Sequence, residues 1–220
     1  MVTIQECYLY VKDRLNNQSS NANQEVAAHT FIRTMRAATY FWLDERLKVE
    51  EVDSTRQREI SNLLVTKLIN GQKRDGYNEF VKPTDFYHKS GFRVQAKKGK
   101  CENVIEGVLV ETANLPSYLG GDDTRPNFEW EQTLVTFGSN KIFVWFRDFD
   151  INKLILTYYR KPVEVDIAGY DHVGGTPSTN VNPEFDDSSV YEILNLTAMI
   201  LAGDTSSPKI QALMGLAKFN

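Results

Sequence analysis

The stretch Leu154-Ile155-Leu156-Thr157-Tyr158-Tyr159-Arg160-Lys161-Pro162 decides the fold of this chain. Residues 154–159 are leucine, β-branched or aromatic, a composition that is typical of a β-strand. Pro162 ends the run, because proline has no N–H group to donate to a sheet. Aromatic and basic residues at the end of a strand fit a protein interface, so Tyr158, Tyr159 and Arg160 are candidate subunit-interface residues.

Upstream of this strand, short β-type runs between turn residues predict a central antiparallel sheet. Gly138-Ser139-Asn140 tolerates the positive φ of a tight hairpin, so the last three runs predict a three-stranded meander. Ile142 to Trp145 is apolar on both faces, which predicts one face packed on helices and the other on a neighbouring subunit. The runs cover residues 104–111, 133–137, 141–146 and 153–159, with weaker runs around Phe80 and Phe92.

Before residue 72, apolar residues recur at helical spacing. Three helices are predicted there, over residues 4–15, 23–49 and 54–71. The third places Ile60, Leu63, Leu64 and Leu68 on one side and ends at Gly71. The N-terminal part is therefore expected to be entirely helical.

The C-terminal part combines a polar loop, over residues 170–183, with two apolar helices. A capping box of Ser189 and Glu192 predicts a helix that Gly203 ends, and Ser207 with Pro208 predicts another. The loop has few apolar side chains, so we expect it to become ordered only on assembly. Apolar residues along this part complete the candidate interface, and they are Phe185, Ile193, Leu196, Ile200, Ile210, Leu213 and Met214.

Together these elements predict an α+β protein with N-terminal helices, a central antiparallel sheet and C-terminal helices. The expected regions are helices over 1–72, a β region over 73–169, a flexible loop over 170–188 and helices over 189–220. One composite domain accommodates all of them in 220 residues.

Composition narrows the function classes. With 41% hydrophobic residues and a formal net charge of −4, the chain lacks the cationic field that tight DNA binding needs. Cys7 and Cys101 share no metal-ligand spacing with the three histidines, so a reducing compartment is expected. The N-terminus lacks the basic and apolar blocks of a signal peptide, and no apolar run is long enough to cross a bilayer. These features predict assembly in a cytosol and no membrane partner.

The sequence predicts no catalytic residues, no metal site and no cofactor. Asp148 and Asp150 flank Phe149 in a predicted turn, where aspartate commonly bonds its own backbone. The same two carboxylates, joined by a distant third, are the basis of one alternative hypothesis, a metal-dependent nuclease. The preferred hypothesis is that the chain is not an enzyme.

Three patterns in the C-terminal third carry a resemblance to a known family. They are Tyr158-Tyr159-Arg160-Lys161-Pro162, the following Val163-Glu164-Val165-Asp166-Ile167, and Asn182-Pro183-Glu184-Phe185 before the capped helix. Over residues 154–202 the arrangement resembles the head-to-tail connector, or adaptor, proteins that form rings in the neck of tailed bacteriophages. It looks most like the ring proteins of crAss-like phages.

This resemblance implies a structural virion protein that is assembled in the host bacterial cytoplasm and forms a homo-oligomeric ring, usually a dodecamer. Such a ring joins the portal protein to further neck and tail proteins, and DNA passes through its channel without sequence-specific binding. The long loop and the large β region depart from the mostly helical adaptors. A tail-completion or minor capsid protein of the same kind of particle is an alternative that the sequence leaves open.

Overall fold

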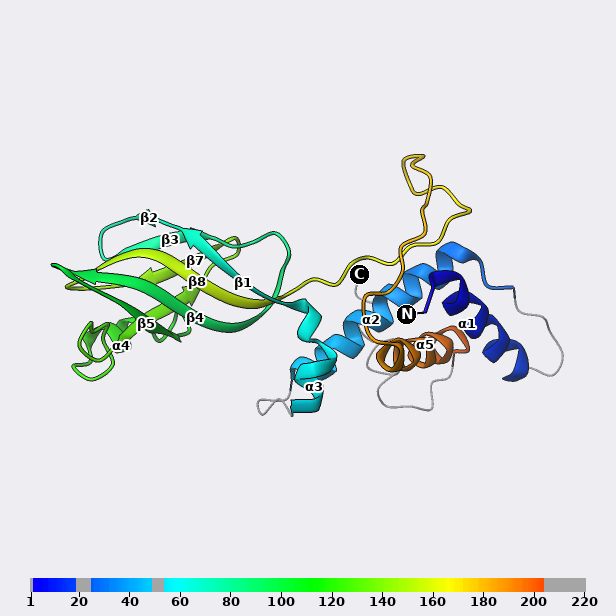
Figure 1. Ribbon diagram of the computed structural model, residues 1–220, viewed down its shortest axis with the longest axis horizontal. Coiled ribbons are helices and arrows are strands. Elements are labelled where there is room, and N and C mark those ends of the chain that lie inside the picture. The colour runs from blue at the N-terminus through cyan, green and yellow to red at the C-terminus, as the bar shows by residue number, and fades with distance from the viewer. Residues whose placement is uncertain (1, 19–24, 49–53, 204–220) are drawn as a thin grey trace. The chain divides into compact units, whose positions relative to one another are not determined.

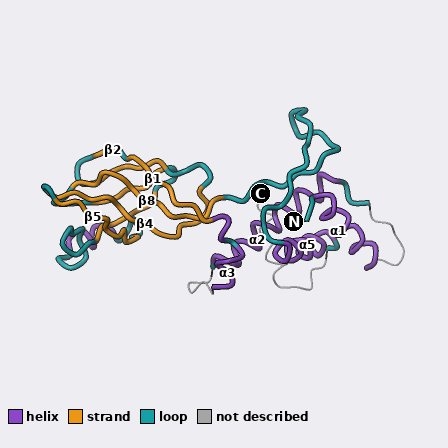
Figure 2. Tube along the Cα trace, viewed as in Figure 1, coloured by secondary structure: helices purple, strands orange, loops and turns teal. Residues whose placement is uncertain are grey.

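A computed structural model describes residues 2–18, 25–48 and 54–203, and the chain divides into two compact units. The helical unit comprises residues 1–62 and 162–220, and the sheet unit comprises Leu63–Lys161. Figure 2 shows that the strands gather in the sheet unit, whereas α1, α2 and α5 belong to the helical unit. The protein is thus of the α+β class, and helices from both ends of the chain share one unit.

Three helices build the core of the helical unit. α5 packs against both α1 and α2 (Figure 1). The helices span Ile4–Gln18 (α1), Ala28–Leu47 (α2), Ser54–Glu59 (α3) and Asp187–Leu201 (α5). Their buried apolar residues recur at helical spacing: Ile4, Cys7, Val11 and Leu15 on α1, Phe31, Ile32, Met35, Ala38, Trp42 and Leu43 on α2, and Val190, Ile193, Leu194 and Ala198 on α5. The helix predicted over 4–15 and the helix predicted between Ser189 and Gly203 are therefore confirmed. The helix predicted over 23–49 is confirmed in its body but begins at Ala28, because residues 25–27 are not helical.

The helix predicted over residues 54–71 is wrong in its second half. α3 ends at Glu59, a 3₁₀ turn follows over Ser61–Leu63, and Leu64–Asn70 forms strand β1. β1 is rich in β-branched residues, which favour strands. It also pairs antiparallel with β8 along its whole length, from Leu64 opposite Tyr159 to Asn70 opposite Lys153. This tertiary pairing outweighs a helical spacing of leucines.

The sheet unit contains one eight-stranded sheet in the order β1-β8-β4-β5-β6-β7-β3-β2. The further strands span Gln72–Lys73 (β2), Tyr77–Val81 (β3), Phe86–Lys98 (β4), Cys101–Leu109 (β5), Gln132–Phe137 (β6), Lys141–Trp145 (β7) and Asp150–Arg160 (β8). β5 and β6 are parallel, so the expectation of a purely antiparallel sheet is wrong. Parallel neighbours need a long crossover, which residues 110–131 supply together with helix α4 (Leu115–Gly120).

The predicted three-stranded meander is correct only in its first two strands. β6 and β7 form the expected antiparallel hairpin around Gly138. β3 occupies the other edge of β7, whereas β8 pairs with β1 and β4. Local turn residues therefore predicted one hairpin but not the partner of the deciding strand.

The sheet curls around a core of its own (Figure 1). Its main cluster consists of strand and turn residues: Phe80, Phe92, Val94, Ala96, Ile105, Val135, Ile142, Val144, Phe149, Ile151, Leu154, Leu156 and Tyr158. On the opposite face of β6, Leu134 packs with Leu115 of α4 and with Val110. Both apolar faces of β6 are thus buried within the sheet unit itself.

Gly71, between β1 and β2, tests this core. A Cβ added there would lie 2.6 Å from Cε1 of Phe80, whose side chain is fully buried. We predict that Gly71→Ala lowers the free energy of unfolding by about 1–3 kcal/mol, as overpacking does. The measurement is urea denaturation followed by circular dichroism. The matched control is Gly91→Ala in β4, where a Cβ meets nothing within 4 Å, and equal losses in both variants would contradict the prediction.

Candidate subunit interface

The deciding stretch forms β8, whose successive side chains point to opposite faces of the sheet. Leu154, Leu156 and Tyr158 are fully buried on the inner face. Ile155, Thr157 and Tyr159 therefore lie on the outer face. Tyr158 and Tyr159, both predicted to present themselves to a neighbour, are separated by this alternation.

An exposed apolar surface, the outer strip, runs along the outer faces of β1 and β8. β1 is the edge strand beside β8, and its Leu64 and Leu68 are 43% and 53% exposed. Antiparallel register places Leu64 opposite Tyr159 and Leu68 opposite Ile155. The hydroxyls of Thr66 and Thr157 are 3.1 Å apart between these pairs. The outer strip is thus the exposed Leu64, Thr66 and Leu68 of β1 with the half-buried Ile155 and Thr157 of β8, and the buried Tyr159 lies at its end.

On the inner face, beneath the outer strip, Tyr158 holds β8 in place through hydrogen bonds. Its hydroxyl donates to Oδ1 of Asp85 at 2.8 Å, and Lys67 of β1 donates to both carboxylate oxygens of Asp85 at 3.1 and 3.2 Å. Burial raises the pKa of the Tyr158 hydroxyl. Burial also opposes the ionisation of Asp85, but hydrogen bonds from Tyr158 and Lys67 hold the pKa of Asp85 below its usual range. Tyr158 is therefore a core residue that locks β1, β8 and the start of β4 together.

Four of the six other predicted interface residues that the structure describes are packed or hydrogen-bonded within the chain. Tyr159 is 8% exposed, and Arg160 is half-buried and donates from Nη1 to the carbonyl of Lys161. Phe185 is 4% exposed, with its ring edge-on to Trp42 at 5.2 Å between centroids. Ile193 faces the helical core. These side chains are not available as a free surface in the described chain.

Three predicted residues, Ile210, Leu213 and Met214, lie outside the described residues. Leu196 and Ile200 are half-buried on α5. Leu196 lines a groove between α2 and α5 with a cavity of about 240 Å³.

The start of α5 differs from the predicted capping box. Asp186 is the N-cap residue, and its Oδ1 accepts from the backbone N–H of Ser189 at 3.2 Å. Glu192 instead accepts from the indole N–H of Trp42 at 2.8 Å and pairs with Arg46. Glu192 thus joins α5 to α2 rather than capping its own helix.

Sequence reasoning missed Asp166, which organises the polar loop. Asp166 and Val181 exchange two backbone hydrogen bonds that close residues 166–181 into a loop. The Asp166 carboxylate accepts from the Tyr170 hydroxyl at 2.6 Å and lies 2.9 Å from Nε2 of His172. It also accepts from the backbone N–H of Thr179 at 3.3 Å. An aspartate just before a glycine-rich loop, with tyrosine and histidine four and six residues later, is the signal that was available.

The two aspartates of the alternative nuclease hypothesis each face a lysine. Lys98 donates to Asp148 at 2.7 Å and to Glu129 at 2.7 Å, and Lys73 pairs with Asp150. The hydrogen bond from Lys98 lowers the pKa of Asp148. A mixed-charge cavity of about 410 Å³ lies between these turns.

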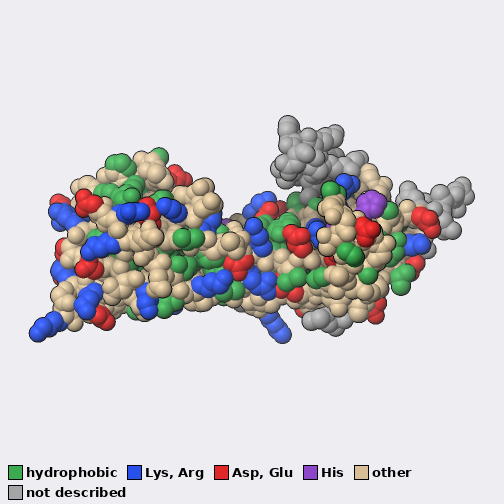
Figure 3. Space-filling view, turned by 90° about the horizontal axis from the view of Figure 1, so that it is seen from above, with side chains coloured by type: hydrophobic (Ala, Val, Ile, Leu, Met, Phe, Trp, Pro, Cys, Tyr) green, Lys and Arg blue, Asp and Glu red, His purple; other side chains and the backbone are tan. Residues whose placement is uncertain are grey.

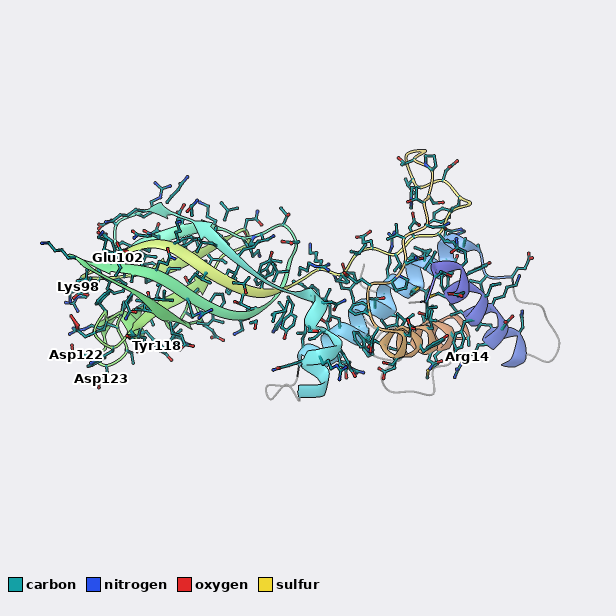
Figure 4. The ribbon with its side chains drawn as sticks, in the orientation of Figure 1. Arg14, Lys98, Glu102, Tyr118, Asp122 and Asp123 are labelled. Atoms are coloured by element: carbon teal, nitrogen blue, oxygen red, sulfur yellow. The ribbon has the colours of Figure 1, made fainter. Side chains whose placement is uncertain are left out.

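Charges of both signs are mixed on the face of the sheet unit drawn in Figure 3, and Figure 4 labels Lys98 and Glu102 on the β4–β5 hairpin.

Within the described ranges, no group of three or more His, Cys, Asp or Glu side chains suits a metal ion. No helix in the described part of the chain is both long and apolar enough to span a membrane.

We predict that Asp166→Asn loosens the loop, because an amide cannot accept all of these hydrogen bonds. Hydrogen exchange of residues 170–179 should accelerate about tenfold or more, the effect of losing about 1.4 kcal/mol. Asp171→Asn, at an exposed loop position, is the control and should exchange like the parent protein. Unchanged exchange in Asp166→Asn would contradict this role.

The same network predicts a pH dependence. Burial opposes ionisation of Asp166, but hydrogen bonds from Tyr170, His172 and the backbone lower its folded pKa overall. Protection of the loop should therefore be complete above the ordinary aspartate pKa of about 3.9 and be lost as the pH falls through the lower folded value.

Comparisons with known proteins give no family assignment. No protein-family model matches the chain, and a search of curated proteins finds no significant match. The residues and their geometry therefore carry the functional proposal.

Proposed function

We propose that this protein is a structural virion subunit that forms a homo-oligomeric ring in the neck of a tailed phage, joining the portal to the tail around the DNA channel. The outer strip is the observation that carries the proposal. Its Leu64 and Leu68 are exposed along an edge strand. The only helix described in the sheet unit, α4, packs instead on β6 and its neighbours.

A closed ring needs two different surfaces on each subunit, because each contact is head to tail. The outer strip supplies one. Val104 of β5 and Trp130 of the β5–β6 crossover supply a second, since they are 45% and 55% exposed. They flank the hydrogen bond from Asn103 to Glu131, which holds the crossover against β5 at 2.6 Å. In the sheet order β5 is separated from β1 by two strands, so the two surfaces are distinct.

The charge distribution also suits passage of DNA. The formal net charge is −4, and Lys97 and Lys98 near the tip of the sheet unit are paired with acidic side chains. Tight phosphate binding requires unpaired cations that release counterions. A wall with balanced charges supports a channel through which DNA slides without being held.

We predict that the purified full-length protein, alone or with the portal protein of its phage, forms rings in negative-stain electron microscopy, and that Leu68→Lys abolishes them. A charge at Leu68 opposes burial against a neighbour, whereas the exposed position predicts a stability change within about 0.5 kcal/mol. Leu9→Lys is the matched control, because Leu9 is 56% exposed on α1. A wild-type protein that stays monomeric under both conditions would refute the ring.

A calorimetric titration separates this proposal from a metal-dependent nuclease. We predict no Mn²⁺ binding by the wild-type protein, because Asp148 and Asp150 each have a lysine partner. The Asp148→Ala, Asp150→Ala double variant should give the same titration. Binding that is present in the wild type and lost in the double variant would favour the nuclease.

A further inference from the structure

Helix α2 and the polar loop line a cavity of about 480 Å³ in the helical unit, here called the loop cavity. This volume lies inside the ~300–1,000 Å³ that is typical of small-molecule sites. Its wall combines cationic and apolar side chains from two segments that are far apart in the sequence. They are His29, Ile32, Arg33 and Arg36 of α2 and Tyr170, Asp171, His172 and Val173 of the loop.

The α2 side of the loop cavity carries two guanidinium groups. Helical spacing places the four α2 residues on one face, because they lie three, four and seven positions apart. Arg33 is exposed, and within the described ranges its guanidinium has no hydrogen-bond or ion-pair partner. Like charges one turn apart on a helix repel each other. An anion between Arg33 and Arg36 would therefore be stabilised by both side chains.

Arg36 is held in place by its own contacts. Its Nε donates to the carbonyl of Val165 at 3.0 Å, and its Nη1 lies 3.1 Å from Glu164. A guanidinium has five N–H donors, so these two contacts leave donors over for a ligand. The Glu164 side chain does not line the loop cavity and is 66% exposed, so solvent screens its charge. Among the lining residues, two arginines thus face one carboxylate, that of Asp171.

Three rings form most of the apolar wall. The Tyr170 ring lies edge-on to the rings of His29 and His172, with centroids 6.4 and 5.1 Å away. The Asp166 carboxylate accepts from the Tyr170 hydroxyl and lies 2.9 Å from Nε2 of His172, so it fixes two of the three rings. Fixed rings beside the apolar side chain of Ile32 favour a ligand with a flat, apolar body.

We propose that the loop cavity binds a small aromatic anion, with its carboxylate or phosphate group between Arg33 and Arg36 and its ring against Tyr170. Both kinds of oxyanion accept paired hydrogen bonds from guanidinium groups. An inorganic anion would leave the ring wall uncovered, and a neutral aromatic molecule would leave Arg33 without a partner. The loop cavity needs no neighbouring subunit, so this proposal and the ring fail independently.

Saturation-transfer NMR on the full-length protein tests the proposal, because it detects weak ligands on subunits and rings alike. The probes are phenyl phosphate and benzoate, which separate the two oxyanions. At least one of them should bind with a Kd of about 1 mM or tighter, and neutral benzyl alcohol should bind about tenfold more weakly or worse. Failure of both anions to bind, or equal binding of benzyl alcohol, would overturn the proposal.

Arg33→Gln tests the position of the anion. The substitution removes a guanidinium at an exposed position, so the fold should be kept, and the affinity for the bound probe should fall about tenfold. Arg93→Gln, at an exposed position of β4 in the sheet unit, is the matched control and should bind like the parent protein. Equal losses in the two variants would indicate general attraction to surface charge and would rule out this site.

Hydrogen exchange locates the ligand without any substitution. At ten times its Kd, the bound probe should slow exchange in residues 170–179 by about tenfold, because it stabilises the closed loop by mass action. Asp171→Asn should bind about twofold more tightly, since it removes the lining carboxylate that repels an anion. Unchanged exchange in the loop, or weaker binding by Asp171→Asn, would contradict the placement of the ligand in the loop cavity.

Discussion

A buried tyrosine hydroxyl must find a hydrogen-bond partner, and in this protein that constraint holds the candidate interface in place. Tyr158 is fully buried and donates to Asp85, which also accepts from Lys67 of β1. The carbonyl of Asp85 accepts from the backbone N–H of Lys161 at 2.7 Å. The end of β8 is therefore fixed through both side chain and backbone. The residues of the outer strip are held in position as well, because they alternate with the fixed residues along β8 and β1.

The sequence identified the deciding strand but not the faces of its residues. Residues 154–159 indicated a strand, and the structure confirms one over Asp150–Arg160. A strand turns adjacent residues to opposite sides, so Tyr158 and Tyr159 were never able to share one surface. Which of them faces inward depends on Asp85 and Lys67, which lie 73 and 91 residues away from Tyr158 along the chain. Local pattern cannot supply that information.

The missed elements share the same cause. Leu64 and Leu68 are four residues apart, as on a helix face, yet both project outward from β1 because β8 offers a paired edge. The parallel pairing of β5 with β6 depends on a crossover that carries only a six-residue helix. Helices α1, α2 and α5, in contrast, follow from spacing alone, because each buries one stripe whatever its partner. The loop around Asp166 was predicted as a loop, but its internal hydrogen bonds require the fold of residues 166–181.

The division into units gives the proposed interface a physical independence from the helices. The sheet unit begins at Leu63 and ends at Lys161. Leu64 and Tyr159, near these two ends, are direct partners in the β1–β8 ladder. An inserted segment whose ends are already adjacent adds little closure cost to the chain that receives it, and it keeps a core of its own. Substitutions on the exposed face of β1 should therefore leave the packing of α1, α2 and α5 unchanged. A surface that can vary in this way, on a unit that folds around its own core, is well suited to matching a neighbour in an assembly.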